Sequence, residues 1–117
     1  MKKILVIDDD TDFLNALESA LKKHGYDVVT SNSCEEGLLT LATFKPNLII
    51  LDVHFKDQDG RDLCKKIKAL GEFRHIPVIL ISADHECLAF YPDYGADAAL
   101  KKPYKLSLLL EVLQRFF

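Results

Sequence analysis

The sequence has few cysteines, no long apolar run and no excess of basic residues, and each shortage excludes a class of protein. Its three cysteines are far apart, which argues against a disulfide framework or a zinc site and fits a reducing compartment. No stretch approaches membrane-spanning length, and the apolar run near Met1 is too short for a signal peptide. A net charge of −3 without a basic face argues against direct nucleic-acid binding. We therefore expect a soluble, cytoplasmic protein that contacts neither nucleic acid nor membrane.

What the sequence does contain is typical of a globular domain. The chain has 117 residues, of which 49% are hydrophobic and 28% are charged. That length supports one hydrophobic core and is too short for two, so residues 1–117 are expected to form a single domain. No repeat, linker or low-complexity segment divides the chain.

Three short apolar runs, at residues 4–7, 48–51 and 78–81, predict strands that are buried on both faces. Continuous apolar runs of this kind are typical of parallel sheets covered by helices on both sides. Two weaker runs, at 28–30 and 98–100, predict further strands.

Segments with helical spacing of apolar residues separate these strands. A helix is expected after Asp10 or Thr11 and another after Ser33. A third is expected around Leu63, Ile67 and Leu70. Residues 85–94 predict an irregular helix because they include Pro92, and residues 106–117 predict a closing helix.

Strand and helix alternate five times, which predicts a single doubly wound α/β domain, a (βα)5 arrangement with right-handed crossovers. The apolar strands need cover on both faces and belong in the middle of the sheet, while the polar second strand and the short fifth strand belong at its edges. The flavodoxin-like strand order 2-1-3-4-5 satisfies both requirements.

This strand order brings five polar side chains to the carboxyl edge of the sheet, where such folds bind ligands. Asp8 and Asp9 follow the first strand, Asp52 ends the third, and Ser82 and Lys102 follow the fourth and fifth. Three carboxylates in one crevice repel one another unless a cation neutralises them, and Mg²⁺ suits oxygen ligands of this kind. A lysine and a hydroxyl suit phosphoryl oxygens. The central carboxylate, Asp52, is then the candidate nucleophile for an acyl phosphate.

These motifs resemble the receiver domains of two-component response regulators, which share the fold of the chemotaxis response regulator. The resemblance covers essentially the whole chain and rests on residues 3–10, 46–52 with Asp59-Gly60, 77–83 and 95–104.

The resemblance implies that Asp8, Asp9, Asp52 and the backbone carbonyl of His54 hold Mg²⁺. It also implies that the domain catalyses the transfer of a phosphoryl group to Asp52 from a histidine kinase or a histidine phosphotransfer protein, followed by slow dephosphorylation. Ser82 and Lys102 would grip the phosphoryl group. The peptide bond that joins Lys102 to Pro103 is expected to be cis.

Two positions depart from the family pattern. Lys56 stands where the family usually has proline, and Ala99 replaces the aromatic residue that usually couples phosphorylation to the surface. A constitutive interaction module that does not use phosphate is therefore an alternative. A stand-alone phosphohydrolase of the haloacid-dehalogenase type is another, because Asp8 and Asp10 bracket one residue at a strand end.

The closing helix has a wide apolar stripe. Leu108 and Val112 lie to one side of Leu109 and widen it beyond what one core contact needs. We expect both side chains to be exposed, on a partner or dimer surface made by the fourth helix, the fifth helix and the last strand. The alternative is that the aromatic segment at residues 90–94 covers them.

Overall fold

The apolar runs of the sequence form the centre of a five-stranded parallel sheet in the computed structural model, which describes residues 1–117. The central strands are β1 (Lys3–Ile7), β3 (Leu48–Asp52) and β4 (Val78–Ser82), and the edge strands are β2 (Asp27–Ser31) and β5 (Ala98–Lys101). The strand order is β2-β1-β3-β4-β5 and every pair is parallel. The predicted doubly wound order is confirmed.

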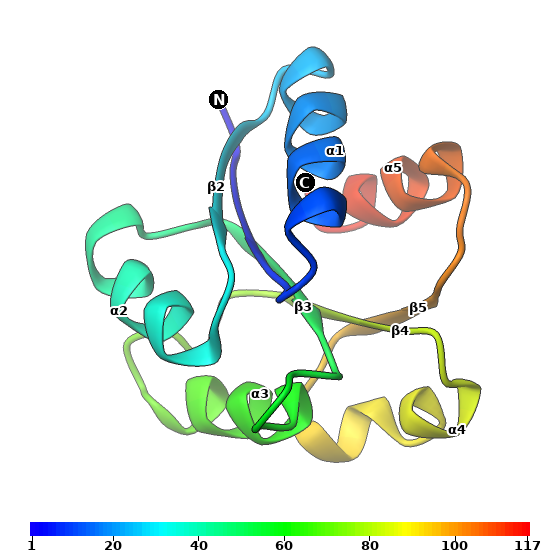
Figure 1. The fold of residues 1–117 in the computed structure, drawn as a ribbon. Coiled ribbons are helices and arrows are strands. Elements are labelled where there is room, and N and C mark those ends of the chain that lie inside the picture. The colour runs from blue at the N-terminus through cyan, green and yellow to red at the C-terminus, as the bar shows by residue number, and fades with distance from the viewer.

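Helices cover both faces of this sheet (Figure 1). On one face lie α1 and α5, and on the other lie α2, α3 and α4. Their bounds are α1 (Thr11–Lys23), α2 (Cys34–Phe44), α3 (Gly60–Ala69), α4 (His85–Leu88), the 3-10 helix η1 (Tyr91–Tyr94) and α5 (Leu106–Gln114). None of these helices combines the length and the apolar composition that a bilayer span requires.

The core is divided into two layers by the alternation of side chains along the central strands. In β3, Ile49 and Leu51 face the layer under α2 and α3, whereas Leu48 and Ile50 face the layer under α1 and α5. All four side chains are fully buried. Because both faces of the strand are covered, its sequence is apolar without interruption until Asp52.

Polar side chains define where several helices begin. Asp10 caps α1 by accepting a hydrogen bond of 3.1 Å from the amide of Phe13, and Ser33 caps α2 by accepting one of 3.1 Å from Glu36. These bonds satisfy amides that have no partner within the first turn of a helix. The sequence offered Asp10 or Thr11 as the cap of α1, and Asp10 is the residue that caps it.

The region predicted as one irregular helix at residues 85–94 is two short helices. Phe90 has φ −118° and ψ 40°, which interrupts the helical conformation between α4 and η1. Pro92 lies in the first turn of η1, where its missing N–H costs nothing. The closing helix, α5, ends at Gln114 rather than at Phe117.

Of the two side chains of α5 that were expected to be exposed, one is exposed and the other is buried. Leu108 is 42% exposed, as expected, but Val112 is only 4% exposed. Val112 lies about 60° around the helix from the fully buried Leu109, which keeps it within the core-facing stripe, whereas Leu108 lies about 100° away. The exposed part of this helix face is therefore narrower than the sequence suggested.

Candidate functional site

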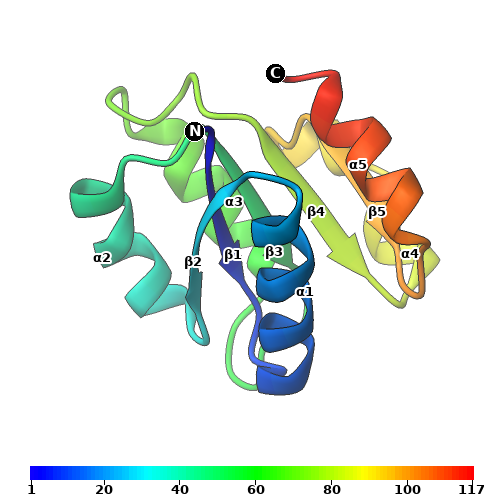
Figure 2. The ribbon, with the colours of Figure 1, turned by 90° about the horizontal axis from the view of Figure 1, so that it is seen from above.

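The strand order brings polar residues together at the carboxyl edge of the sheet. Asp8 follows β1, and Asp52 and Ser82 are the last residues of β3 and β4. Lys102 follows β5, and its amide donates a hydrogen bond of 2.9 Å to the carbonyl of Ser82. Figure 2 shows the arrows of β1 and β4 pointing the same way, so these strand ends share one side of the molecule. The predicted juxtaposition is confirmed.

Three carboxylates form the centre of this edge. Oxygen atoms of Asp8, Asp9 and Asp52 all lie within 4.8 Å of one another. Asp8 and Asp52 are 1% and 6% exposed, while Asp9 is exposed to solvent. The amide of Asp10 donates a hydrogen bond of 2.9 Å to Oδ1 of Asp8, which fixes that carboxylate and leaves Oδ2 facing the cluster.

One ammonium group lies among these carboxylates. Nζ of Lys102 donates a hydrogen bond of 2.8 Å to Oδ2 of Asp8 and lies 3.5 Å from Oδ1 of Asp52. The peptide bond that joins Lys102 to Pro103 is cis, as expected. Burial disfavours the charged form of Lys102, but the hydrogen bond to Asp8 and the charges of both carboxylates outweigh it, so the pKa of Lys102 is raised.

The charge of Asp52 is held in an unfavourable environment. Burial, followed by the negative charge of Asp8, raises the pKa of Asp52 from 3.8 to about 6, although Lys102 acts in the opposite direction. A second positive charge would therefore stabilise the ionised form of Asp52 further. The site is suited to binding a cation, or a ligand that carries a cation with it.

The side chain of His54 is a part of the site that the sequence did not predict. Its Nε2 lies 2.9 Å from Oγ of Ser82, and the same hydroxyl accepts a hydrogen bond of 2.9 Å from the amide of Asp84. The expectation concerned only the backbone carbonyl of His54. The alternation of side chains along β3 gives no signal for this contact, because His54 lies beyond the end of that strand.

The ring of Phe13 is a second unpredicted contact. Nζ of Lys102 lies 4.0 Å from the centroid of this ring, which α1 places beside the site. An ammonium over an aromatic face is attracted by the electron density of the ring. Phe13 therefore helps to hold the lysine at the strand ends.

The loop after β3 is held tightly against Asp52. The amide of Gly60 donates a hydrogen bond of 2.7 Å to the carbonyl of Val53, and a Cβ atom at Gly60 would overlap the carbonyl oxygen of Asp52. Only glycine permits this approach. The turn that contains Lys56 is closed by a hydrogen bond of 3.2 Å from the amide of Phe55 to the carbonyl of Gln58.

Comparison with known proteins identifies the family. Residues 4–114 match the model of the response regulator receiver domain. The chain belongs to this family. Its receiver fold is shared by a CheY-like receiver domain protein of Methanospirillum hungatei, with 31% identity, a TM-score of 0.89 and coverage of 98% of this chain and 92% of that one. A chemotaxis protein of Vibrio cholerae gives a TM-score of 0.92 at 25% identity, over 100% and 99% of the two chains.

Curated relatives of this receiver are longer proteins. The alkaline phosphatase synthesis transcriptional regulatory protein of Bacillus subtilis is 35% identical over 105 residues, which are 88% of this chain and 43% of that protein. The KDP operon transcriptional regulatory protein of Escherichia coli is 35% identical over 112 residues, which are 93% of this chain and 48% of that protein. The receiver spans less than half the length of these relatives.

Proposed function

We propose that this receiver is a phosphorylation switch in which Asp52 accepts a phosphoryl group from a phosphohistidine. The observation that carries the proposal is the position of Asp52, a buried carboxylate at the end of β3 with one oxygen 3.5 Å from the ammonium of Lys102. Two further carboxylates surround it. Membership of the response regulator family supports a histidine kinase or a histidine phosphotransfer protein as the donor.

The donor set of the cluster fits Mg²⁺. Asp8, Asp9 and Asp52 offer only oxygen atoms, which are the ligands this hard cation prefers, and the exposed side of Asp9 leaves room for the waters it retains. We propose that these three carboxylates and the carbonyl of His54 hold the ion. When bound, it would supply positive charge that neutralises the carboxylates and the phosphoryl oxygens.

The residues of this chain then have separate roles in the transfer. An oxygen of Asp52 forms a bond to phosphorus while the bond between phosphorus and the donor imidazole breaks, and the imidazole takes a proton from solvent. The ammonium of Lys102 neutralises charge on the phosphoryl oxygens. The hydroxyl of Ser82 is hydrogen-bonded to the ring of His54 and to the amide of Asp84. On phosphorylation it would turn to donate a hydrogen bond to a phosphoryl oxygen.

The added charge would alter a partner-binding surface near the rearranged groups. Ser82 ends β4 and leads directly into α4, so a change in its hydrogen bonds acts on the start of that helix. A surface made by α4, β5 and α5 for a dimer partner or an effector remains our prediction. The exposed Leu108 belongs to it.

A constitutive interaction module is the second candidate function. The observation that favours it is Ala99, a small, partly buried side chain on β5 where the family usually has an aromatic residue. In that case the fold would present its surface without a phosphate signal. The hydrolase alternative has lost its main support, because Asp10 caps α1 by accepting a hydrogen bond from Phe13.

Incubation with acetyl phosphate and Mg²⁺, followed by intact-mass measurement, tests the proposal. We expect the parent protein to gain one phosphate and Asp52→Asn to gain none. Asp57→Asn is the matched control, because Asp57 is an exposed carboxylate in the same loop, and it should be modified like the parent. No modification of the parent would favour the constitutive module, and rapid turnover of acetyl phosphate would favour a hydrolase.

A further inference from the structure

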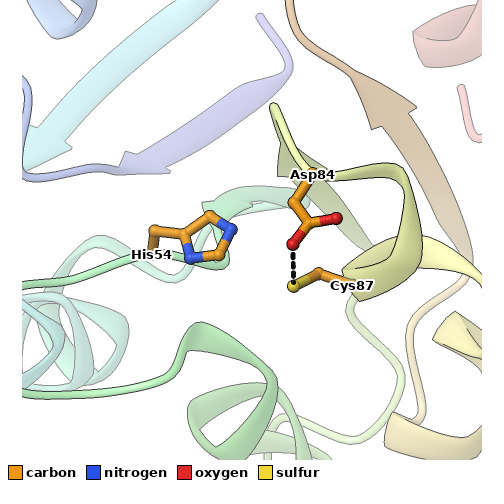
Figure 3. Close-up of side chains that lie close together, drawn as sticks. All are labelled: His54, Asp84 and Cys87. Atoms are coloured by element: carbon orange, nitrogen blue, oxygen red, sulfur yellow. Dashed lines mark hydrogen bonds between the residues drawn. The ribbon is translucent and has the colours of Figure 1, made fainter.

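A second group of ligand-forming side chains lies beside the carboxylate cluster. Side-chain ligand atoms of His54, Asp84 and Cys87 all lie within 4.8 Å of one another. His54 comes from the loop after β3, whereas Asp84 and Cys87 come from the start of α4. Figure 3 shows the three side chains directed toward a common space between these two segments. The separate positions of the cysteines in the sequence had argued against such a site.

The chemistry of this group differs from that of the carboxylate cluster. An imidazole nitrogen, a carboxylate oxygen and a sulfur atom form a mixed donor set, which suits a borderline-soft dication such as Zn²⁺ and not Mg²⁺. Zn²⁺ sites with three protein ligands and a bound water are common. A carboxylate and a thiolate together also balance the two charges of the ion.

Asp84 can serve this site without giving up its role in the fold. Its Oδ1 accepts a hydrogen bond of 2.9 Å from the amide of Glu86 and so caps α4. Its Oδ2 accepts a hydrogen bond of 3.4 Å from the thiol of Cys87. The second oxygen is therefore already aimed at the sulfur. Asp84 is the N-cap residue of α4, and capping turns its carboxylate toward the first turn of the helix, where Cys87 lies.

The thiol of Cys87 is not arranged as a nucleophile. Burial, followed by the hydrogen bond and charge of Asp84, raises the pKa of Cys87, so the sulfur keeps its proton in the free protein. The thiol donates to Asp84 and makes no hydrogen bond to His54. A cysteine–histidine catalytic pair would need the opposite arrangement.

The three side chains are accessible to an ion from solvent. His54 and Asp84 are exposed and Cys87 is partly exposed. The hydrogen bond from Cys87 to Asp84 joins two members of the group, and an ion could replace it. Bond lengths of about 2.0–2.3 Å in a tetrahedral zinc site place ligand atoms roughly 3.3–3.8 Å apart. Side-chain movements of about 1 Å would bring the three atoms to that spacing.

We propose that His54, Asp84 and Cys87 form a binding site for a borderline-soft divalent cation of the Zn²⁺ type, with water as the remaining ligand. Binding replaces the thiol proton, which passes to solvent, so the ion and its two anionic ligands have no net charge. The site shares His54 with the proposed Mg²⁺ site, to which that residue would offer its backbone carbonyl, but it uses the imidazole of His54 and two residues outside the Asp8–Asp9–Asp52 cluster. It does not require a phosphoryl group on Asp52.

Titration with Co²⁺ in the presence of excess Mg²⁺ tests the proposal, because excess Mg²⁺ would compete with Co²⁺ for the carboxylate cluster. A cobalt–thiolate charge-transfer band should appear, saturate at one equivalent and disappear when Zn²⁺ is added. Cys87→Ser should abolish the band and His54→Gln should weaken it. His85→Gln is the matched control, because His85 is exposed beside Asp84 but lies outside the cluster, and it should behave like the parent.

Alkylation provides a readout that is independent of spectroscopy. One equivalent of Zn²⁺ should protect Cys87 from iodoacetamide, as located by peptide mass mapping. Cys34 and Cys64 are buried and should stay unmodified in both cases. Equal alkylation of Cys87 with and without Zn²⁺, or a cobalt band that persists in Cys87→Ser, would overturn the proposal.

Discussion

Lys102 donates a hydrogen bond of 2.8 Å to Asp8, a residue 94 positions earlier in the chain. The acceptor is almost fully buried, whereas the lysine is partly exposed. A buried carboxylate needs a partner, and this ammonium supplies both a hydrogen bond and a positive charge. In the free domain the lysine is thus engaged mainly by Asp8, with Asp52 at 3.5 Å as its second contact.

Replacing Lys102 by methionine should destabilise the free domain in Mg²⁺-free buffer. Methionine keeps an apolar stem but leaves Asp8 without its cation. We expect a loss of about 1.5–3 kcal/mol in the free energy of unfolding, the range for hydrogen bonds to charged groups. Urea unfolding measures it, with Lys101→Met, an exposed neighbour, as the control. Equal losses in the two variants would contradict the role of the Asp8 contact.

Mg²⁺ should stabilise the domain through the three carboxylates. At 100 times its dissociation constant, linkage predicts an increase of about 2.7 kcal/mol in the free energy of unfolding. Asp9→Asn should lose most of this response without disturbing the fold, because Asp9 is exposed. Asp12→Asn, an exposed charge change in the first turn of α1, is the control. If thermal melts of the parent and of Asp9→Asn respond alike to Mg²⁺, the metal assignment is wrong.

The raised pKa of Asp52 predicts a specific dependence of stability on pH in Mg²⁺-free buffer. The folded state holds the proton of Asp52 up to about pH 6, whereas the unfolded chain releases it near pH 4. The contribution of Asp52 to stability is therefore fully present below pH 4 and is lost as the pH rises through 6, at up to about 1.4 kcal/mol per pH unit. Asp52→Asn removes this loss.

Urea unfolding of both proteins at several pH values measures this effect. The difference in unfolding free energy should move in favour of Asp52→Asn between pH 4 and 6 and then stay constant. A difference that does not change with pH would show that the pKa of Asp52 is not raised in the folded state.

Leu108 and Val112 should respond in opposite ways to the same substitution. Leu108→Glu adds a charge to an exposed position and should change the free energy of unfolding by no more than about 0.5 kcal/mol. Val112→Glu buries a charge without a partner and should cost more than about 3 kcal/mol or prevent folding. Chemical unfolding compares the two variants.

The proposed partner surface predicts a second effect of Leu108→Glu. The variant should weaken self-association or effector binding while it remains folded. Analytical ultracentrifugation of the phosphorylated protein measures self-association. Pull-down with an identified effector measures the other interaction. Unchanged binding in both measurements would remove Leu108 from the surface.

The fold and the main cluster could be predicted because they depend on strong, short-range signals. Uninterrupted apolar runs identified β1, β3 and β4, and their burial on both faces fixed them at the centre of the sheet. Once the strand order was known, the residues after each strand had to share an edge. Asp8, Asp52 and Lys102 followed from topology alone.

The remaining features depend on side-chain directions and on local chain geometry. The contact of His54 with Ser82 requires the path of the loop after β3, which hydrophobic periodicity does not determine. The grouping of Asp84 and Cys87 depends on where α4 begins. The prediction that Val112 is exposed was wrong because an offset of about 60° from Leu109 keeps a side chain within the core-facing side of the helix.

The long separation of Asp8 and Lys102 has a consequence for the synthesis of the protein. Asp8, Asp9 and Asp52 leave the ribosome well before β5 and Lys102 do, so a nascent chain carries the proposed phosphoryl acceptor without the ammonium of Lys102. Contacts between such distant residues form late, because closing a long loop costs entropy before the contact is gained. A nascent chain that stops before β5 should therefore accept no phosphoryl group, and competence should begin only when the last strand has joined the sheet.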